Sequence, residues 1–132
     1  MSYAQETPAA VTTPSAALGS MDVFYSKSTR TLNYKVTWSG LLDSLSLMHV
    51  HGLAPIGYAA GIVQNIVAAS GAIFPQKTAG KFTFSQSGTI SGTLLVDGVK
   101  VKEEDLLNGL YYINIHTTPN PSGEIRGQIK FQ

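Results

Sequence analysis

The sequence contains three histidines, and each falls within a run of residues that predicts a β-strand. His49 and His51 belong to the run 45–51, and His116 belongs to the run 110–117. Side chains two positions apart on a strand point to the same face, so we expect the imidazoles of His49 and His51 to lie side by side. Neutral imidazoles suit copper, zinc and nickel. We therefore predict a metal site formed by His49, His51 and His116, with copper as the favoured ion and zinc as the next.

The alternative interpretation is that these histidines make structural hydrogen bonds. Strand histidines often do so, and a pair with the spacing His-x-His is a weak signal by itself. A third histidine in another predicted strand, His116, favours a metal site because it supplies the further ligand that the pair lacks. The chain has no cysteine, which excludes thiolate ligands and cysteine nucleophiles.

Polar residues elsewhere in the chain are candidates for supporting this site. Asn114 shares a strand face with His116, so its amide could hydrogen-bond a ligand. Arg126 and Glu124 share a face of the last predicted strand, and Arg126 could guide an anion towards the ion. Two structural alternatives stay open, in which Arg126 pairs with Glu124 or binds a loop carbonyl. Glu6 lies in an N-terminal segment predicted to be extended, and we expect it to cap or pair with backbone amides.

The composition narrows the class of protein. Apolar residues make up 43% of the 132 residues, which is enough for a core without disulfides or structural metals. Charged residues make up 13%, and the net charge is +1 with no basic run longer than two residues. This charge distribution excludes the basic footprint of a nucleic-acid-binding protein. No apolar run approaches the roughly 20 residues of a membrane span.

Short runs with β-type residues, separated by turn residues, dominate the chain. Strands are predicted at residues 21–25, 31–38, 45–51, 89–96, 110–117 and 124–131, and residues 81–84 also alternate. Residues 59–69 fit either a strand or a short helix, and residues 5–14 are predicted to be extended. One helix is predicted at residues 102–108, with Gly109 at its C-terminal end. This pattern predicts an all-β fold, a Greek-key β-sandwich or barrel of short antiparallel strands with one short helix.

Several motifs, in a fixed order, carry a resemblance to a known family. They are QETP at residues 5–8, LNYKVTWSGL at 32–41, HVHG at 49–52, EDLLNG at 104–109, YYINIHT at 111–117 and NPSGEIRGQI at 120–129. Together they resemble the CHRD (chordin) domain family along nearly the whole chain. The resemblance implies a secreted, periplasmic or cell-surface protein whose leader has been removed. It also implies a CHRD domain at residues 5–132, with residues 1–4 a leader remnant or residues added for expression.

A second resemblance concerns the copper site of the copper/zinc superoxide dismutases. Those enzymes place a His-x-His pair on one strand of a β-sandwich, a further copper ligand on a late strand, and an anion-guiding arginine near the C-terminus. His49, His51, His116 and Arg126 occur in that order here. The bridging histidine and the disulfide cysteines of those enzymes have no counterpart in this sequence. The likeness is an analogy in the site and implies a superoxide-dismutase-like arrangement of the sandwich.

The sequence is therefore compatible with three alternative functions. The first is a secreted or periplasmic domain that binds a copper or zinc ion through three histidines. The second is a copper oxidoreductase of superoxide-dismutase type. The third is a metal-free extracellular module for adhesion or protein interaction. The sequence leaves open whether the protein is an enzyme and which protein partner it has.

Overall fold

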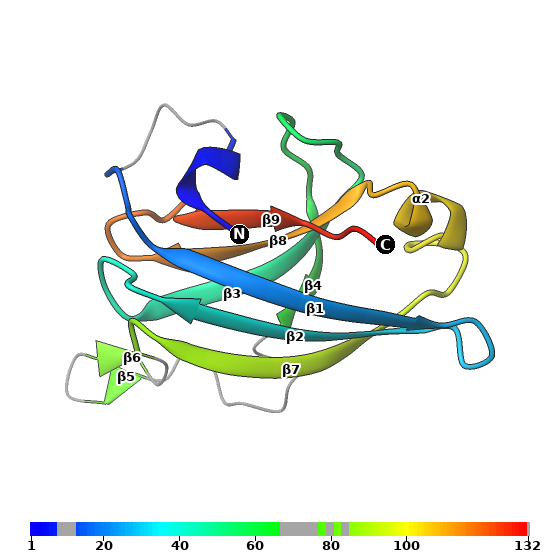
Figure 1. The fold of residues 1–132 in the computed structure, drawn as a ribbon, viewed down its shortest axis with the longest axis horizontal. Helices are drawn as coiled ribbons and strands as arrows, with labels where there is room; N and C mark the ends of the chain where they lie inside the picture. The colour runs from blue at the N-terminus through cyan, green and yellow to red at the C-terminus, as the bar shows by residue number, and fades with distance from the viewer. Residues whose placement is uncertain (8–12, 67–76, 79–80, 83–84, 132) are drawn as a thin grey trace.

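The computed structural model describes residues 1–7, 13–66, 77–78, 81–82 and 85–131, and its strands form two packed sheets (Figure 1). The three-stranded sheet has the order β1 (Leu18–Ser26), β2 (Thr31–Ser39), β7 (Gly88–Leu95). The four-stranded sheet has the order β4 (Ile62–Asn65), β3 (Leu45–Gly52), β8 (Tyr111–Thr117), β9 (Ile125–Gln128). All the strand pairs are antiparallel in the described ranges, which confirms the predicted all-β sandwich.

In the described ranges, four small elements accompany the two sheets. Strands β5 (Lys77–Thr78) and β6 (Lys81–Phe82) form a separate pair, and the 3₁₀ helix η1 (Tyr3–Gln5) lies near the N-terminus. The short helix α2 (Glu103–Leu107) links β7 to β8 and confirms the predicted helix. Gly109, just after α2, has a φ of 72°, a conformation that favours glycine and ends a helix.

The order of the strands shows that the chain crosses repeatedly between the sheets. The links β2–β3, β4–β7 and β7–β8 each join one sheet to the other, whereas β1–β2, β3–β4 and β8–β9 are antiparallel neighbours within a sheet. The crossovers place β8 beside β3, although more than fifty residues separate these strands in the sequence. The segment 118–124 makes the tight connection between β8 and β9 that Pro119, Pro121 and Gly123 predicted.

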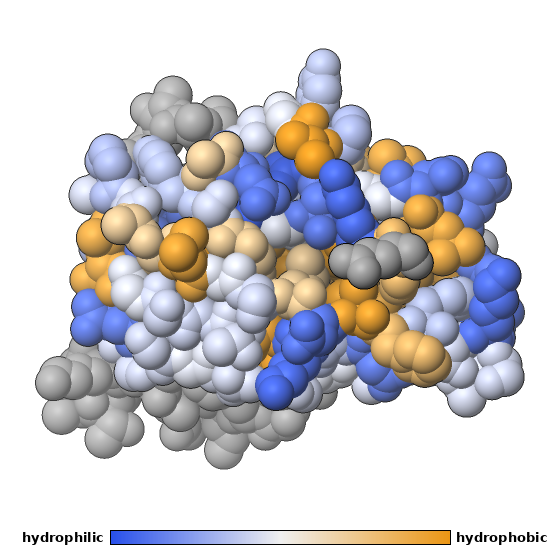
Figure 2. All heavy atoms as spheres, viewed as in Figure 1, coloured by the Kyte–Doolittle hydropathy of each residue, from blue (hydrophilic) through white to orange (hydrophobic). Residues whose placement is uncertain are grey.

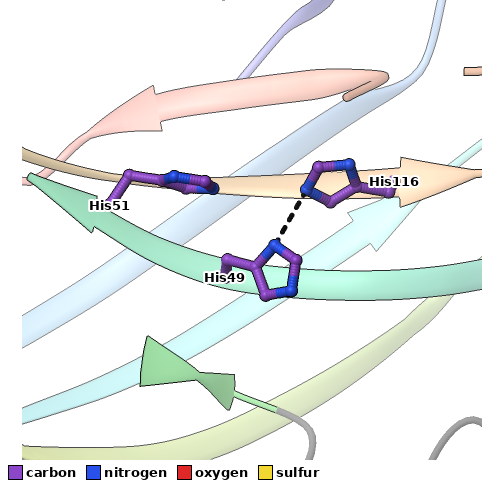
Figure 3. A group of neighbouring side chains, drawn as sticks. All are labelled: His49, His51 and His116. Carbon is purple, nitrogen blue, oxygen red and sulfur yellow. Dashed lines mark hydrogen bonds between the residues drawn. The ribbon is translucent and has the colours of Figure 1, made fainter. Parts of the chain in front are cut away.

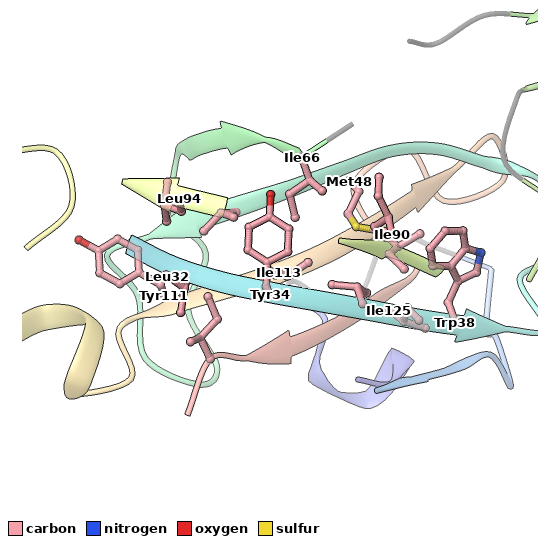
Figure 4. Packing of buried hydrophobic residues seen from close by; sticks show 14 of the residues in the cluster. Leu32, Tyr34, Trp38, Met48, Ile66, Ile90, Leu94, Tyr111, Ile113 and Ile125 are labelled. Carbon is pink, nitrogen blue, oxygen red and sulfur yellow. The ribbon is translucent and has the colours of Figure 1, made fainter. Parts of the chain in front are cut away.

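The core lies between the inner faces of the two sheets (Figure 4). Along β2 buried and exposed residues alternate, and the buried set is Leu32, Tyr34, Val36 and Trp38. This alternation is the period of a half-buried strand, and it confirms the prediction that Trp38 belongs to the core. The opposite sheet contributes Met48 and Val50 from β3 and Ile113 and Ile115 from β8.

Strand β8 is buried on both of its faces, unlike β2. All seven of its residues are buried, and residues 48–51 of β3 are buried in the same way. Since the isoleucines of β8 face the core, Asn114 and His116 face the other side of the sheet. That outer face is covered by other parts of the chain, so polar side chains are held there away from solvent.

The N-terminal residues join the open edges of the two sheets. Ser2 forms β-bridges to Leu18 at the start of β1 and to Arg126 in β9. The backbone of Met1 exchanges hydrogen bonds with Gly19, and the Met1 side chain packs against the core. Figure 1 shows the N-terminus between β9 and β1.

Some predicted boundaries differ from the structure. In the ambiguous run 59–69, residues Ile62–Asn65 form β4, and residues 67–69 lie outside the described residues. Gln5 ends the helix η1 rather than starting an extended segment, because the backbone N–H of Glu6 bonds to the carbonyl of Tyr3. The last strand is shorter than predicted, with β9 covering 125–128 of the predicted 124–131, and residues 83–84 of the run 81–84 lie outside the described residues.

A matched pair of substitutions tests the position of the core. Val36 is fully buried in β2, whereas Val99 is 83% exposed in the link between β7 and α2. Val36→Ala is expected to lower the free energy of unfolding by about 1.5–3 kcal/mol, and Val99→Ala by about 0.5 kcal/mol or less. Urea unfolding of the two variants measures the difference. Equal losses would contradict the packing described.

Candidate metal centre

The pairing of β3 with β8 brings the three histidines together on the outer face of the four-stranded sheet. His49 lies opposite Asn114 and His51 opposite Tyr112, while His116 lies opposite Leu47. The ring centroid of His49 is 4.8 Å from that of His116 and 5.5 Å from that of His51. One ligand nitrogen from each ring can be chosen so that all three lie within 4.8 Å of one another (Figure 3). The three predicted ligands therefore form one cluster.

Two backbone carbonyls decide where His51 and His116 carry their protons. The Nδ1 atom of His51 lies 2.9 Å from the carbonyl oxygen of Ala60, and Nδ1 of His116 lies 2.9 Å from that of Pro121. A carbonyl oxygen only accepts, so in the neutral rings Nδ1 holds the proton and Nε2 has a free lone pair. Histidines that ligate metals usually donate their other ring N–H in this way.

His49 completes the cluster through its Nδ1 atom. This atom lies 3.1 Å from Nε2 of His116, and Figure 3 shows the contact as a dashed line. Because Nε2 of His116 is an acceptor, His49 donates its Nδ1 proton to it when no ion is bound. An ion bound at both nitrogens would displace that proton, and neutral His49 would then carry its proton on Nε2.

The surroundings favour the neutral form of His49 and His116. Burial, together with the neighbouring His116 and His51, lowers the pKa of His49 from 6.5 to about 4. Burial also lowers the pKa of His116, against the effect of its hydrogen bond to Pro121. His49, His51 and His116 are 5%, 8% and 6% exposed, so the cluster is desolvated. Neutral rings have the lone pairs that a metal ion needs.

Arg126 holds the segment that covers the cluster. Its guanidinium donates to the carbonyl oxygens of Tyr58 at 2.7 Å and Pro55 at 3.2 Å, and to Oε1 of Gln128 at 2.9 Å. Its Cζ atom lies 3.5 Å from the centre of the Tyr112 ring. That ring in turn stacks on His51, with centroids 4.8 Å apart and planes 6° apart. Arg126 is 1% exposed, and its contacts are those of the alternative in which it binds loop carbonyls.

Glu124 lies in a different set of contacts. Its carboxylate is fully buried and accepts hydrogen bonds from the Ser15 hydroxyl at 2.6 Å, the Leu42 backbone N–H at 2.9 Å and the Thr117 hydroxyl at 2.5 Å. Within the described ranges, no ion pair joins Glu124 to Arg126. Glu124 thus connects three chain segments next to the cluster and does not meet the histidines.

Glu6 lies behind the cluster, a position that its place in the sequence did not indicate. It is 7% exposed, and burial raises its pKa to about 7 against the opposing effects of Arg126 and of hydrogen bonds from the Thr7 backbone and the Asn114 side chain. The expected pairing with a backbone amide is thus present. The carboxylate packs against Gly123, where an added Cβ would lie 2.6 Å from Oε1. No pattern in the sequence indicates that residue 6 contacts residue 114, because only the tertiary fold brings them together.

Replacing Glu124 tests its structural position. Glu124→Ala leaves the Leu42 amide and two hydroxyls without their acceptor, so we expect a loss of about 2–4 kcal/mol in the free energy of unfolding. Metal affinity of the folded variant is expected to match the wild type, since Glu124 contacts none of the three histidines. Urea unfolding and metal titration measure the two quantities. A variant of normal stability with weakened metal binding would contradict this placement.

Two buried groups act in opposite directions on the pH dependence of stability. His49 has a folded pKa of about 4 against 6.5, so the unfolded chain binds more protons in that interval and acid lowers the free energy of unfolding. Glu6 has a folded pKa of about 7 against 4.5, so the folded chain binds more protons there, and its contribution is lost as the pH rises. Between pH 4.5 and pH 6.5, His49 and Glu6 therefore change the free energy of unfolding in opposite directions.

Replacing the Glu6 carboxyl group should reveal how His49 alone changes the free energy of unfolding with pH. In metal-free Glu6→Gln, the free energy of unfolding is expected to fall more steeply than in the wild type between pH 6.5 and pH 4.5. The difference in slope should reach at most about 1.4 kcal/mol per pH unit, the value for one proton. Urea unfolding of both proteins across this range measures the slopes. Parallel curves would show that Glu6 does not titrate as its burial requires.

Comparison with known proteins gives one match. The family model described as CHRD domain matches residues 1–129, which is nearly the entire chain. No curated protein matches, and no solved structure matches either. None of the helices in the described ranges has the length and apolar character of a membrane span. The match covers the strands that hold the three histidines as well as the strands of the core. The chain belongs to the CHRD domain family.

Proposed function

We propose that this CHRD domain binds one transition-metal ion through His49, His51 and His116, with copper preferred and zinc next. The observation that carries the proposal is the pair of carbonyl contacts at Ala60 and Pro121. They fix the tautomers of two imidazoles, so that Nε2 of His51 and Nε2 of His116 both carry lone pairs, and Nε2 of His116 lies 3.1 Å from Nδ1 of His49. A histidine cluster that served the fold alone would not need acceptor atoms to converge.

The energetic argument supports an ion at this position. The three imidazoles are buried on the outer face of the sheet, where their lone pairs have lost contact with water. A bound cation would give these lone pairs a charged partner. Divalent copper binds nitrogen ligands more tightly than the other first-row ions, which supports copper over zinc. The rigid pairing of β3 with β8 would hold the ligands in place before the ion arrives.

The covering of the site supports a binding role over a catalytic one. A copper oxidoreductase of superoxide-dismutase type needs an open coordination position and a path for the anion. Here the rings are at most 8% exposed, and the guanidinium of Arg126 is buried against loop carbonyls. We therefore propose that the domain holds, stores or delivers the ion. CHRD domains occur in extracellular proteins, and we propose a secreted, periplasmic or cell-surface location on that ground.

The surface gives less support to a metal-free interaction module. Figure 2 shows apolar groups distributed among polar ones on the described part of the viewed face, rather than gathered into one area. Phe24 and Leu95 are exposed on the three-stranded sheet, at 67% and 62%. Single exposed apolar residues of this kind are normal on monomeric proteins.

Metal titration of the purified protein tests the proposal. Copper(II) at about 100 times its dissociation constant should raise the free energy of unfolding by about 2.7 kcal/mol, because the ion binds the folded site alone. His51→Ala and His116→Ala should each lower copper affinity at least about 10-fold. Thr37→Ala, on the outer face of the other sheet, is the control. Thermal unfolding and chelator competition measure both effects.

The outcomes separate the three candidate functions. If copper, zinc and nickel all leave thermal unfolding unchanged, the metal-binding proposal is wrong and the interaction module remains. Superoxide dismutation by copper-loaded protein above the rate of free copper, and lost in His49→Ala, would favour the oxidoreductase. Metal analysis of protein purified without chelators identifies the ion it carries.

A further inference from the structure

A fourth polar atom lies among the three imidazoles. The side-chain oxygen Oδ1 of Asn114 is 2.9 Å from Nε2 of His51 and 2.9 Å from Nε2 of His116. We propose that Asn114 Oδ1 is the fourth donor to the ion, which makes an N₃O site, and that Glu6 is the positioning residue that turns this oxygen towards it. This inference rests on the proposed function and assigns Asn114 a direct role in it.

The tautomers of the two histidines rule out ordinary hydrogen bonds to Oδ1. Both rings use their Nδ1 protons on the carbonyls of Ala60 and Pro121, so both Nε2 atoms are acceptors. An amide oxygen is also an acceptor. Oδ1 of Asn114 therefore faces two acceptor nitrogens at 2.9 Å each with no proton on either contact, and a cation held by these atoms would relieve the repulsion. The arrangement is therefore suited to a bound cation.

The opposite orientation of the amide would remove that repulsion, so the direction of Asn114 matters. Turned over, its NH₂ group would donate to both imidazoles and leave a closed hydrogen-bond network without an ion. Glu6 favours the orientation observed, because its carboxylate accepts a hydrogen bond from the Asn114 side chain. An amide that donates to Glu6 presents its oxygen to the histidines.

The position of Glu6 is itself fixed by the fold. The helix η1 ends with the Glu6 backbone N–H on the carbonyl of Tyr3, and Ser2 pairs with Arg126 of β9. The carboxylate lies over Gly123, whose φ of 131° and lack of a side chain leave room for it. Its Oε1 atom has no hydrogen-bond partner in the described part of the chain. The N-terminal segment therefore belongs to the architecture of the site.

The spacing of the donors favours copper(II) over zinc. On an ion with bonds of about 2.05 Å, donors at right angles are about 2.9 Å apart, and donors at the tetrahedral angle are about 3.3 Å apart. The two Oδ1 contacts are 2.9 Å long, and Nδ1 of His49 is 3.1 Å from Nε2 of His116. Nitrogen and oxygen donors at right angles are typical of copper(II) and nickel(II), whereas zinc prefers a tetrahedron.

The widest donor spacing shows how much the site must close. The three ligand nitrogens lie up to 4.8 Å apart. Opposite donors on one ion are separated by about 4.1 Å, so an imidazole would move inwards by less than an ångström on binding. A change of this size is within the reach of side-chain torsions on a fixed sheet.

Copper(II) binding by four variants at pH 8 tests the inference. Asn114→Leu keeps the volume and removes the oxygen, so copper affinity should fall about 10–100-fold while pulsed electron paramagnetic resonance still detects three imidazoles. Glu6→Ala should weaken binding by about 10-fold, and Glu6→Gln should restore it because the glutamine oxygen accepts the same hydrogen bond. Asn33→Leu, on the exposed face of β2, is the matched control.

A double variant provides a second test in case Asn114→Leu does not fold. Glu6→Gln combined with Asn114→Asp keeps the hydrogen bond with donor and acceptor exchanged, and it places a carboxylate oxygen on the ion. It should bind copper at least about 10-fold more tightly than the wild type, with altered copper hyperfine splitting. Unchanged affinity and spectrum in both Asn114 variants would overturn the fourth donor. Broadening of the wild-type spectrum by ¹⁷O-labelled water, together with unchanged copper affinity in Asn114→Leu, would also overturn it, since water would then be the oxygen donor.

The experiments distinguish an error in the fourth donor from an error in the proposed three-histidine metal site. If wild-type protein binds no copper, the three-histidine site and its fourth donor fall together. If wild-type protein binds copper through three imidazoles and Asn114→Leu behaves like Asn33→Leu, the fourth donor alone is wrong.

Discussion

The antiparallel pairing of β3 with β8 is the constraint on which the rest of the molecule depends. His49 and His116 are 67 residues apart in the sequence, and this single ladder places them in contact. The same ladder aligns Met48 and Val50 with Ile113 and Ile115 on the core side. A slip of one residue would exchange the two faces and send histidines into the core. Hydrophobic burial therefore selects the register, and the same register brings the polar cluster together.

A second layer over the sheet gives the cluster its chemical character. The carbonyls of Ala60 and Pro121 choose the tautomers, and the Arg126 guanidinium fixes the segment that contains Ala60 through its bonds to Pro55 and Tyr58. A buried guanidinium needs acceptors, and backbone carbonyls of a loop provide them without adding a negative charge near the imidazoles. The loop and the arginine thus stabilise each other, and the histidines remain buried beneath them.

Much of the fold, and less of the site, could be predicted from the sequence. Alternation in β2 and the turn residues before β9 predicted a sandwich, and the His-x-His spacing predicted two imidazoles on one face. Alternation could not show that the outer face of β8 is covered, since Ala60, Pro121 and Glu6 reach it from distant segments. For the same reason the sequence grouped Glu124 with Arg126, whereas the structure separates their contacts.

Because β3 and β8 are far apart in the sequence, the histidine cluster is completed late in folding. Ladders between distant strands form late, because the loop between them must first be closed at an entropic cost. Before that step His49 and His51 are a pair of neighbouring side chains on a flexible chain, and the third ring is far away. A bound ion would therefore enter the complete cluster only after this ladder has formed.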